Sequence, residues 1–270
     1  MEKLGEILPE ALPGQTLPEN TGSSLKPQTC PECGRVIEPV FVPVFNRWIL
    51  PACNCQVAKF LQEEEKRQQR EKRSRIERLF ANSGLGPRFS GCTFENWIKR
   101  RGTEEAYKAA FEYAENISRN IRSGKGFLIF GDPGNGKSHL AAAVINTALQ
   151  KSFTAVFERV PKLLAKIRAT YQGGEVTEHQ IMKILTDADL LALDDAGAEK
   201  WTEWTEPTLY TIVDERYTHN KALIVTTNSN LDELEKKVGF RAMDRILEMC
   251  EIVENRGTSF RQERAKKRRY

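Results

Sequence analysis

One segment of the sequence has residue types and spacing that are typical of phosphate binding. The run Gly131-Asp132-Pro133-Gly134-Asn135-Gly136-Lys137-Ser138 matches the pattern G-x-x-x-x-G-K-[ST] at every fixed position. Glycines let the backbone wrap closely around phosphates, and the N-terminus of a following helix adds a favourable dipole. In this chemistry Lys137 contacts the β- and γ-phosphates, and the Ser138 hydroxyl binds Mg²⁺. His139 begins the helical pattern after the loop, and we include it in the predicted nucleotide-binding set.

Two adjacent carboxylates follow an apolar run further along the chain. Leu190-Leu191-Ala192-Leu193 precedes Asp194 and Asp195, about 57 residues after the loop lysine. An apolar strand that ends in acids is the expected partner of a phosphate-binding loop, because its first carboxylate holds Mg²⁺. We therefore expect Asp194 to bind magnesium together with Ser138. Asp195 would orient or activate the attacking water, and capping a helix is the alternative role for this residue.

A third polar residue ends another strand candidate. Ala222–Thr226 is apolar and β-branched, and Asn228 follows shortly after it. Ligand contacts in open α/β sheets lie at strand ends beside the switch point. Asn228 could therefore contact the γ-phosphate or its water, whereas a turn-forming asparagine is an equally good interpretation from position alone.

Four of the six cysteines gather in two close pairs. Cys30 and Cys33 form a C-x₂-C pair, and Cys53 and Cys55 form a tighter C-x-C pair after 19 intervening residues. Four thiolates at this spacing suit one tetrahedral Zn²⁺, which would be structural because no coordination position stays open. Incidental free thiols are the alternative. The insert contains β-prone sequence, enough for a hairpin.

The remaining elements follow from hydropathy patterns. From about residue 88 onward, strand candidates alternate with helical stretches. The strand candidates are Gly126–Phe130, Thr154–Glu158, Leu190–Leu193, Ala222–Thr226 and Glu251–Val253, and the helical stretches are Lys137–Gln150, Pro161–Tyr171, Glu178–Thr186 and Glu206–His219. This alternation predicts an α/β fold with a parallel sheet and helices on both faces. Cys92 and Cys250 fall in this part, and we interpret them as ordinary thiols.

Composition shifts suggest five regions. We expect a flexible leader over 1–29, a zinc module over 30–55, a charged connecting helix over 56–84, an ATPase domain over 85–262 and a basic tail over 263–270. The last ten residues carry six basic side chains and one acid, so the other 260 residues sum to −1 out of a total of +4. The tail suits nucleic-acid phosphates, or it is an ordinary solvated terminus.

Overall composition excludes several classes of protein. The 270 residues are 40% hydrophobic and 29% charged, with a mean hydropathy of −0.52. No apolar run reaches the roughly 18 residues of a membrane span, and the start lacks the features of a signal peptide. We therefore expect a cytoplasmic protein without membrane contact.

The motifs together resemble the DnaC/DnaI group of AAA+ ATPases, the bacterial replicative helicase loaders, and their IstB-type relatives in transposition. The resemblance covers roughly residues 85–262 and depends on the order of five segments. These are G-D-P-G-N-G-K-S-H-L, L-A-L-D-D-A-G-A-E-K, I-V-D-E-R-Y, I-V-T-T-N and R-A-M-D-R-I…G-T-S-F-R. The resemblance implies a P-loop AAA+ core without a C-terminal lid domain, with ATP and Mg²⁺ as cofactors.

The resemblance also implies roles for single residues. Asn228 takes the sensor 1 position. Arg245 falls where the family carries an arginine finger that reaches a neighbouring subunit's ATP, and Arg241 is the competing candidate. Arg261 resembles the sensor 2 arginine. A fixed guanidinium near the γ-phosphate stabilises charge in the transition state.

Three functional hypotheses follow. The first is a helicase loader that binds a replicative ring helicase through residues 1–80 and single-stranded DNA through the AAA+ core, with slow hydrolysis and self-association through the ATP site. The second is a transposition helper ATPase that assembles on duplex DNA. The third is a zinc-dependent adaptor with a structural nucleotide site, which the intact Lys137 and Asp194 argue against. The cysteine module could contact protein or grip DNA, and we favour protein.

Overall fold

The computed structural model describes residues 25–173, 175–198 and 202–267. The described residues fall into two compact units, one up to Arg67 and the other from Gln68 onward, and the boundary lies within helix α1 (Asn54–Leu79). None of the described helices combines the length and the apolarity that crossing a membrane requires.

The first unit carries two small antiparallel ladders. Strand β1 (Gln28–Thr29) pairs with β2 (Val36–Ile37), and β3 (Val40–Val42) pairs with β4 (Arg47–Ile49). The predicted hairpin is therefore present as β3 and β4, joined by a short 3₁₀ turn at Pro43–Phe45. The last residues of the expected flexible leader are a strand, because their backbone pairs with β2. The rest of that leader lies outside the described residues.

The second unit is built around one parallel five-stranded sheet in the order β6-β7-β8-β5-β9. The strands are β5 (Gly126–Phe130), β6 (Ala155–Arg159), β7 (Leu190–Ala196), β8 (Ala222–Thr227) and β9 (Cys250–Glu254). Their apolar runs are buried on both faces, as in parallel sheets covered by helices. The predicted fold class is confirmed.

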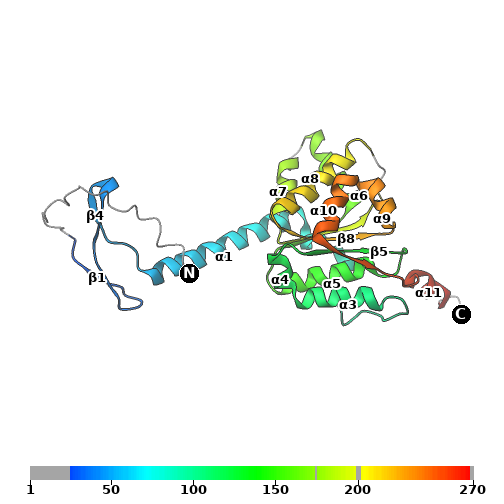
Figure 1. Ribbon diagram of the computed structural model, residues 1–270, viewed down its shortest axis with the longest axis horizontal. Coiled ribbons are helices and arrows are strands. Elements are labelled where there is room, and N and C mark those ends of the chain that lie inside the picture. Colours follow the sequence, from blue (N-terminus) through cyan, green and yellow to red (C-terminus); the bar gives the residue numbers. More distant parts are fainter. Residues whose placement is uncertain (1–24, 174, 199–201, 268–270) are drawn as a thin grey trace. The chain divides into compact units, whose positions relative to one another are not determined.

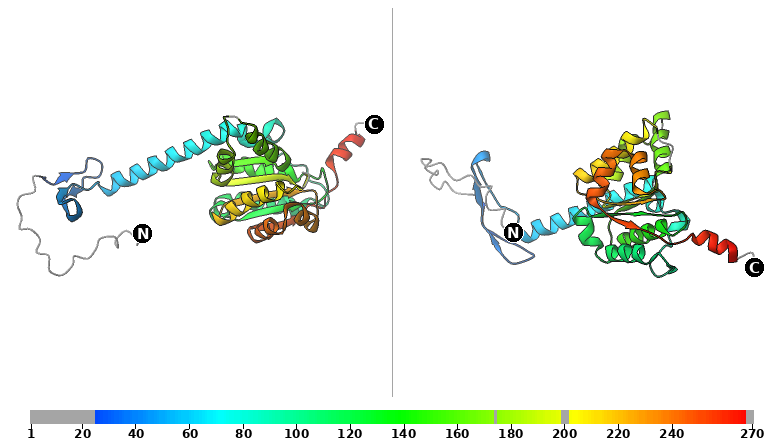
Figure 2. Two further views of the ribbon diagram at one scale, coloured as in Figure 1. Left: turned by 90° about the horizontal axis from the view of Figure 1, so that it is seen from above. Right: turned by 45° about the vertical axis from the view of Figure 1, so that its right-hand side comes forward.

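Helices cover both faces of this sheet, as Figures 1 and 2 show. One face packs against α2 (Gly86–Phe89), α3 (Glu104–Glu115), α4 (Ile117–Arg122) and α5 (Lys137–Gln150). The other packs against α6 (Val160–Ala169), α7 (Glu178–Asp187), α8 (Thr205–Thr218), α9 (Leu231–Val238), α10 (Phe240–Met249) and the end of α1. The carboxyl ends of β5, β7 and β8 therefore meet at one edge, where such sheets bind ligands.

Several boundaries differ from the sequence expectations. Helix α1 begins at Asn54, inside the segment expected as the zinc module, because the Gln56 side chain accepts a hydrogen bond from the Cys53 backbone (3.2 Å) at the helix start. Helix α6 ends at Ala169, and a 3₁₀ turn continues to Gln172. Helix α11 (Phe260–Lys267) begins within the expected ATPase domain and continues into the expected basic tail as far as the described residues reach.

Candidate nucleotide and metal sites

The phosphate-binding loop lies between β5 and α5, as the sequence predicts. Gly136 has a φ of 108°, a left-handed conformation that favours glycine, and the Trp97 ring occupies the space that a side chain there would need. The Lys137 Nζ donates to the carbonyl oxygens of Gly131 (2.7 Å) and Asp132 (2.8 Å) and to the Asn135 side chain (3.2 Å). Three oxygen atoms of the loop therefore hold the Lys137 ammonium group in place.

Two residues outside the loop, Asn255 and Arg100, form hydrogen bonds that hold the loop in position. The buried Asn135 side chain donates to the Asn255 carbonyl oxygen (2.6 Å), and the Asn255 backbone donates to Phe130 at the end of β5 (2.8 Å). The Arg100 guanidinium donates to the carbonyl oxygens of Asn135 (2.6 Å) and Thr258 (2.5 Å). Neither Asn255 nor Arg100 was predicted from the sequence, although Asn255 follows a predicted strand just as Asn228 does.

Asp194 is 2% exposed and lies beside the loop helix. Burial raises the pKa of its carboxyl, and hydrogen bonds from the hydroxyls of Ser138 and Thr226 oppose this rise. The Thr226 hydroxyl donates to Oδ1 at 2.7 Å. A buried carboxylate beside a hydroxyl offers the hard oxygen ligands that Mg²⁺ prefers, so Ser138 and Asp194 fit the predicted magnesium position.

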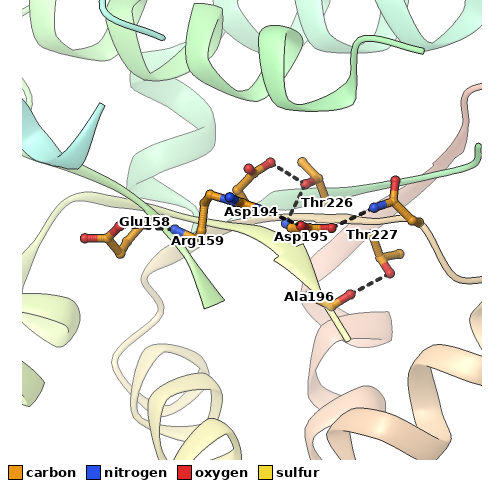
Figure 3. Close-up of polar contacts among 8 residues, drawn as sticks. Glu158, Arg159, Asp194, Asp195, Ala196, Thr226 and Thr227 are labelled. Carbon is orange, nitrogen blue, oxygen red and sulfur yellow. Dashed lines mark hydrogen bonds and ion pairs between the residues drawn. The ribbon is translucent and has the colours of Figure 1, made fainter. Parts of the chain in front are cut away.

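Asp195 points into the same cavity because the strand is irregular there. Successive residues of a regular strand point to opposite faces, but the pairing of β7 with β8 shifts between Leu193 and Ala196. Asp195 itself has a φ of 61°, and its N–H donates to the Thr226 hydroxyl (3.0 Å). This local irregularity turns two consecutive carboxylates toward one site (Figure 3).

Both oxygens of Asp195 have partners. The Asn228 side chain donates to Oδ1 at 2.6 Å, and the Arg159 guanidinium donates to Oδ2 at 2.7 Å. This hydrogen bond raises the pKa of Arg159 above its usual value. Arg159 is the last residue of β6 and was not predicted as a site residue, although its place after the predicted strand Thr154–Glu158 was a usable signal.

A cavity of about 400 Å³ joins these groups. It is bordered by the loop from Pro133 to His139 and by Asp194, Asp195, Asn228, Arg159 and Arg261. His139 contacts the Thr93 carbonyl oxygen (2.9 Å) through Nε2 and lies edge-on to the Trp97 ring, so it supports the cavity wall. The structure thus brings together the predicted loop, both acids, Asn228 and Arg261.

The other two predicted arginines lie elsewhere. Arg245 in α10 pairs with Asp214 (3.3 Å) and covers the Tyr217 ring at 4.5 Å from its centroid, both partners being on α8. Arg241 is exposed at the start of α10. Neither residue borders the cavity of its own chain. A role at the nucleotide would therefore require the site of a second copy.

The four predicted zinc ligands converge. The sulfur atoms of Cys30, Cys33, Cys53 and Cys55 all lie within 4.8 Å of one another. Sulfurs around a tetrahedral Zn²⁺ are about 3.8 Å apart, given Zn–S bonds of about 2.3 Å, so the donor set fits zinc. Backbone hydrogen bonds from Cys33 and Glu32 lower the pKa of the Cys30 thiol to about 7, which favours the thiolate that a metal needs.

Comparisons with known proteins agree with this geometry. A family model described as IstB-like ATP binding protein matches residues 109–268. The replicative helicase loader DnaC of Escherichia coli (strain K12) is 32% identical over 180 residues, which cover 66% of this chain and 72% of that protein. DnaC of Buchnera aphidicola subsp. Baizongia pistaciae is 29% identical over 177 residues, covering 65% and 71% of the two chains.

Solved structures show the same fold. The crystal structure of the DnaC helicase loader superimposes with a TM-score of 0.57 at 24% identity, covering 63% of this chain and 100% of that chain. AMPPCP-bound DnaA from Aquifex aeolicus gives a TM-score of 0.55 at 24% identity, covering 68% of this chain and 55% of that one. The predicted resemblance is confirmed: the chain has a DnaC-like AAA+ fold and belongs to the IstB-like ATP-binding protein family.

Proposed function

We propose that this chain is an ATPase of replication initiation that loads a replicative ring helicase onto single-stranded DNA. The observation that carries the proposal is the 32% identity to the loader DnaC across 72% of that protein, in a chain whose loop and acid pair surround one cavity. ATP would bind with its phosphates at the loop, and Lys137, Ser138 and Asp194 would hold the phosphates and Mg²⁺.

In hydrolysis, the oxygen of a water molecule attacks the γ-phosphorus and the bond to the β–γ bridging oxygen breaks. Asp195 is the proposed acceptor of the water's proton. Asn228 orients the Asp195 carboxylate through the 2.6 Å hydrogen bond to its Oδ1. Arg261 borders the cavity and would stabilise the transferring phosphoryl group. Arg245 of a second copy, or Arg241, would complete the site, so turnover by a dilute chain would be slow.

An exposed cluster on the second unit supports single-stranded DNA as a ligand. The Tyr171 side chain is 56% exposed and its ring meets the Trp204 ring edge-on at 6.2 Å. The Arg168 guanidinium lies over Trp204 at 4.7 Å from the ring centroid. Aromatic rings beside a cation are the groups on which unpaired bases stack while phosphates are neutralised. The basic helix α11 offers further phosphate contacts.

The first unit is the proposed helicase-binding part. Five apolar residues among those described there are more than half exposed, namely Val36 (58%), Val44 (87%), Phe45 (66%), Phe60 (65%) and Leu61 (60%). Clusters of exposed apolar residues mark protein interfaces. The four cysteines would bind structural zinc and stabilise this small unit, which has little apolar core of its own.

Co-migration on a sizing column tests the proposal. We expect the zinc-loaded full chain to co-migrate with the replicative ring helicase of the same organism. The amount of this complex should differ between samples with and without ATP. The double variant Val44→Ser/Phe45→Ser should lose the complex, whereas the control Leu247→Ser, which changes a 45% exposed apolar residue of α10, should keep it. Absence of a complex with or without ATP would refute the loader function.

The second candidate is a transposition helper acting on duplex DNA, since the matching family model is IstB-like. ATP-dependent assembly on duplex DNA, without helicase binding, would support it.

A further inference from the structure

Arg100 borders the nucleotide cavity but has no role in the proposed hydrolysis. Its guanidinium donates to the carbonyl oxygen of Asn135 in the phosphate-binding loop (2.6 Å) and to that of Thr258 (2.5 Å), and it covers the Phe260 ring at 5.3 Å from the centroid. The turn that carries Arg100 is itself fixed, because the buried Thr103 hydroxyl donates to the Arg100 carbonyl oxygen (2.7 Å). The guanidinium is therefore held at a defined place beside the loop.

The part of the loop that Arg100 reaches lies between two glycines. Gly134 and Gly136 have φ values of 83° and 108°, left-handed conformations that glycine adopts more readily than other residues. A glycine beside a peptide bond leaves several orientations of that peptide group open, so the loop sequence alone does not fix the direction of its N–H groups. Contacts from outside the loop therefore select one orientation.

Two peptide groups of the loop are held through their carbonyl oxygens. Arg100 donates to the Asn135 carbonyl oxygen, and the Phe260 N–H donates to that of Gly134 (3.0 Å). In a planar trans peptide, the C=O and the N–H of the next residue point in opposite directions. The two contacts therefore direct the N–H groups of Asn135 and Gly136 away from these donors. In loops of this pattern, backbone N–H groups bind the α- and β-phosphates of a nucleotide.

Arg100 influences both peptide groups. Its contact with Asn135 is direct, and its contact with Thr258 fixes the segment that carries the Phe260 N–H. The Asn255 side chain also reaches the Asn135 carbonyl oxygen, but at 3.4 Å. A hydrogen bond with one charged partner is about twice as strong as a neutral one. Arg100 is therefore the stronger of the two donors at this carbonyl.

We propose that Arg100 is a positioning residue that aims the N–H groups of Asn135 and Gly136 at the β-phosphate of the bound nucleotide. The inference rests on the proposed function, in which the loop binds the phosphates of ATP. Arg100 acts through the backbone of the loop and not by contact with the nucleotide. Its effect is therefore the same for ADP and for ATP, which share the β-phosphate.

Nucleotide titration of the zinc-loaded full chain tests this role. Arg100→Met keeps an apolar stem over the Phe260 ring but has no donor. It should raise the Kd for ADP and for a non-hydrolysable ATP analogue by the same factor, about tenfold or more, as expected for a lost hydrogen bond with a charged partner. Arg100→Ala should show the same loss. Arg100→Lys should recover part of the affinity, because its ammonium can donate to the Asn135 carbonyl oxygen.

The matched control is Arg256→Ala, which should bind both nucleotides like the unmodified chain. Arg256 lies close to Thr258 in the sequence, pairs with Glu254 at 2.7 Å and does not border the cavity. Cooperative unfolding in urea shows whether each variant is folded, and the Arg100→Lys variant carries the test together with whichever of Arg100→Met and Arg100→Ala folds.

Several outcomes overturn the inference. Unchanged Kd values in Arg100→Met and Arg100→Ala would show that the arginine does not position the loop. A loss for the ATP analogue alone would show that Arg100 contacts the γ-phosphate directly. Binding by Arg100→Lys that is no tighter than that of Arg100→Met would show that a charged donor is not required, and an equal loss in Arg256→Ala would show a general disturbance of the segment.

Lys137→Ala separates these failures from that of the proposed function. If Lys137→Ala binds both nucleotides as tightly as the unmodified chain, the loop is not the phosphate site, and the proposed function fails together with the inference. Weak binding by Lys137→Ala leaves the proposed function standing, so the Arg100 variants then decide the inference alone.

Discussion

At the scale of the residue, the ammonium of Lys137 links ATP binding to pH. Burial lowers its pKa to about 8, although Asp195, Asp194 and Asp132 oppose this shift. The protonated amine is the form that attracts phosphates, so the affinity for ATP should fall as pH rises through 8. We expect the Kd for a non-hydrolysable ATP analogue to increase by up to about tenfold between pH 7 and pH 9.

Titration calorimetry or a fluorescent nucleotide checks this dependence. Lys137→Ala is the control, and it should bind weakly at every pH over the same range. A Kd for the unmodified chain that stays constant from pH 7 to pH 9 would contradict the assignment of Lys137 to the phosphates.

Single aromatic residues should carry the contact with DNA. Tyr171→Ala or Trp204→Ala should each weaken binding of a fluorescent single-stranded oligonucleotide by about 1–3 kcal/mol, the range for one stacked base. Fluorescence anisotropy measures this effect. The variant Phe240→Ala is a suitable control, because Phe240 is 69% exposed on α10. Equal binding by all three variants and the unmodified chain would place the DNA elsewhere.

The sequence alone was enough to predict those site residues whose types and spacing form a motif within one short segment. The glycine-rich loop and the two acids occupy fixed positions after apolar strands, and the structure brings them around one cavity. Arg159, Trp97 and Arg100 were missed because their partners are distant in the sequence, and only the folded sheet brings them to the loop. The turn of Asp195 depends on a register shift against β8, which no local pattern reveals.

At the scale of the element, β6, α6 and the end of α1 are joined by one buried carboxylate. The Glu158 side chain is 2% exposed and pairs with Lys166 (3.2 Å) and Lys162 (3.1 Å). Lys166 also donates to the Leu79 carbonyl oxygen (3.1 Å) and lies 3.8 Å from the centroid of the Phe80 ring. This junction ties the end of α1 to the sheet within the second unit.

Removing the less exposed lysine should therefore destabilise the second unit. Lys166→Met keeps the contact with Phe80 but leaves Glu158 with Lys162 and the Arg159 N–H (3.4 Å), both at Oε1, at a cost of about 1–3 kcal/mol in the free energy of unfolding. Lys162→Met should cost less than about 1 kcal/mol, because Lys162 is 64% exposed. Urea unfolding compares the two midpoints. Equal midpoints would show that the junction at Lys166 is not structural.

Elements with strong periodicity were predicted better than those with mixed composition. Strand β5 and helix α5 match their expected bounds, since each is an apolar run beside a clear turn signal. Helices α3, α4, α9 and α10 were not anticipated. These helices are rich in charged residues, so the narrow apolar stripe along each of them gives only a weak pattern in the sequence. Burial of this stripe against the sheet and neighbouring helices stabilises the helices.

At the scale of the whole molecule, the metal and the nucleotide should act on separate units. A strong chelator, or Cys33→Ser, should expose residues 30–55 to proteolysis and abolish helicase binding. This unit has little apolar core, so metal binding by the four thiolates would supply much of its stability. ATP binding by the second unit should change less than about twofold, since both sites lie in different compact units. Cys92→Ala, a change outside the cluster, should retain one zinc per chain.

Limited proteolysis, metal analysis and nucleotide titration on the same samples decide the matter. Unchanged proteolysis after metal removal would show that the cysteine cluster does not stabilise the first unit. Loss of ATP affinity with the metal would show that the two units are not independent.

In the proposed function, ATP binding and hydrolysis by this chain place a ring helicase on single-stranded DNA. The direct test measures how much replicative ring helicase of the same organism becomes bound to closed circular single-stranded DNA with the chain and ATP. We expect many-fold more bound helicase with the chain than without it, and we expect Lys137→Ala to lose this gain. The same amount of bound helicase with and without the chain would show that the chain is not a helicase loader.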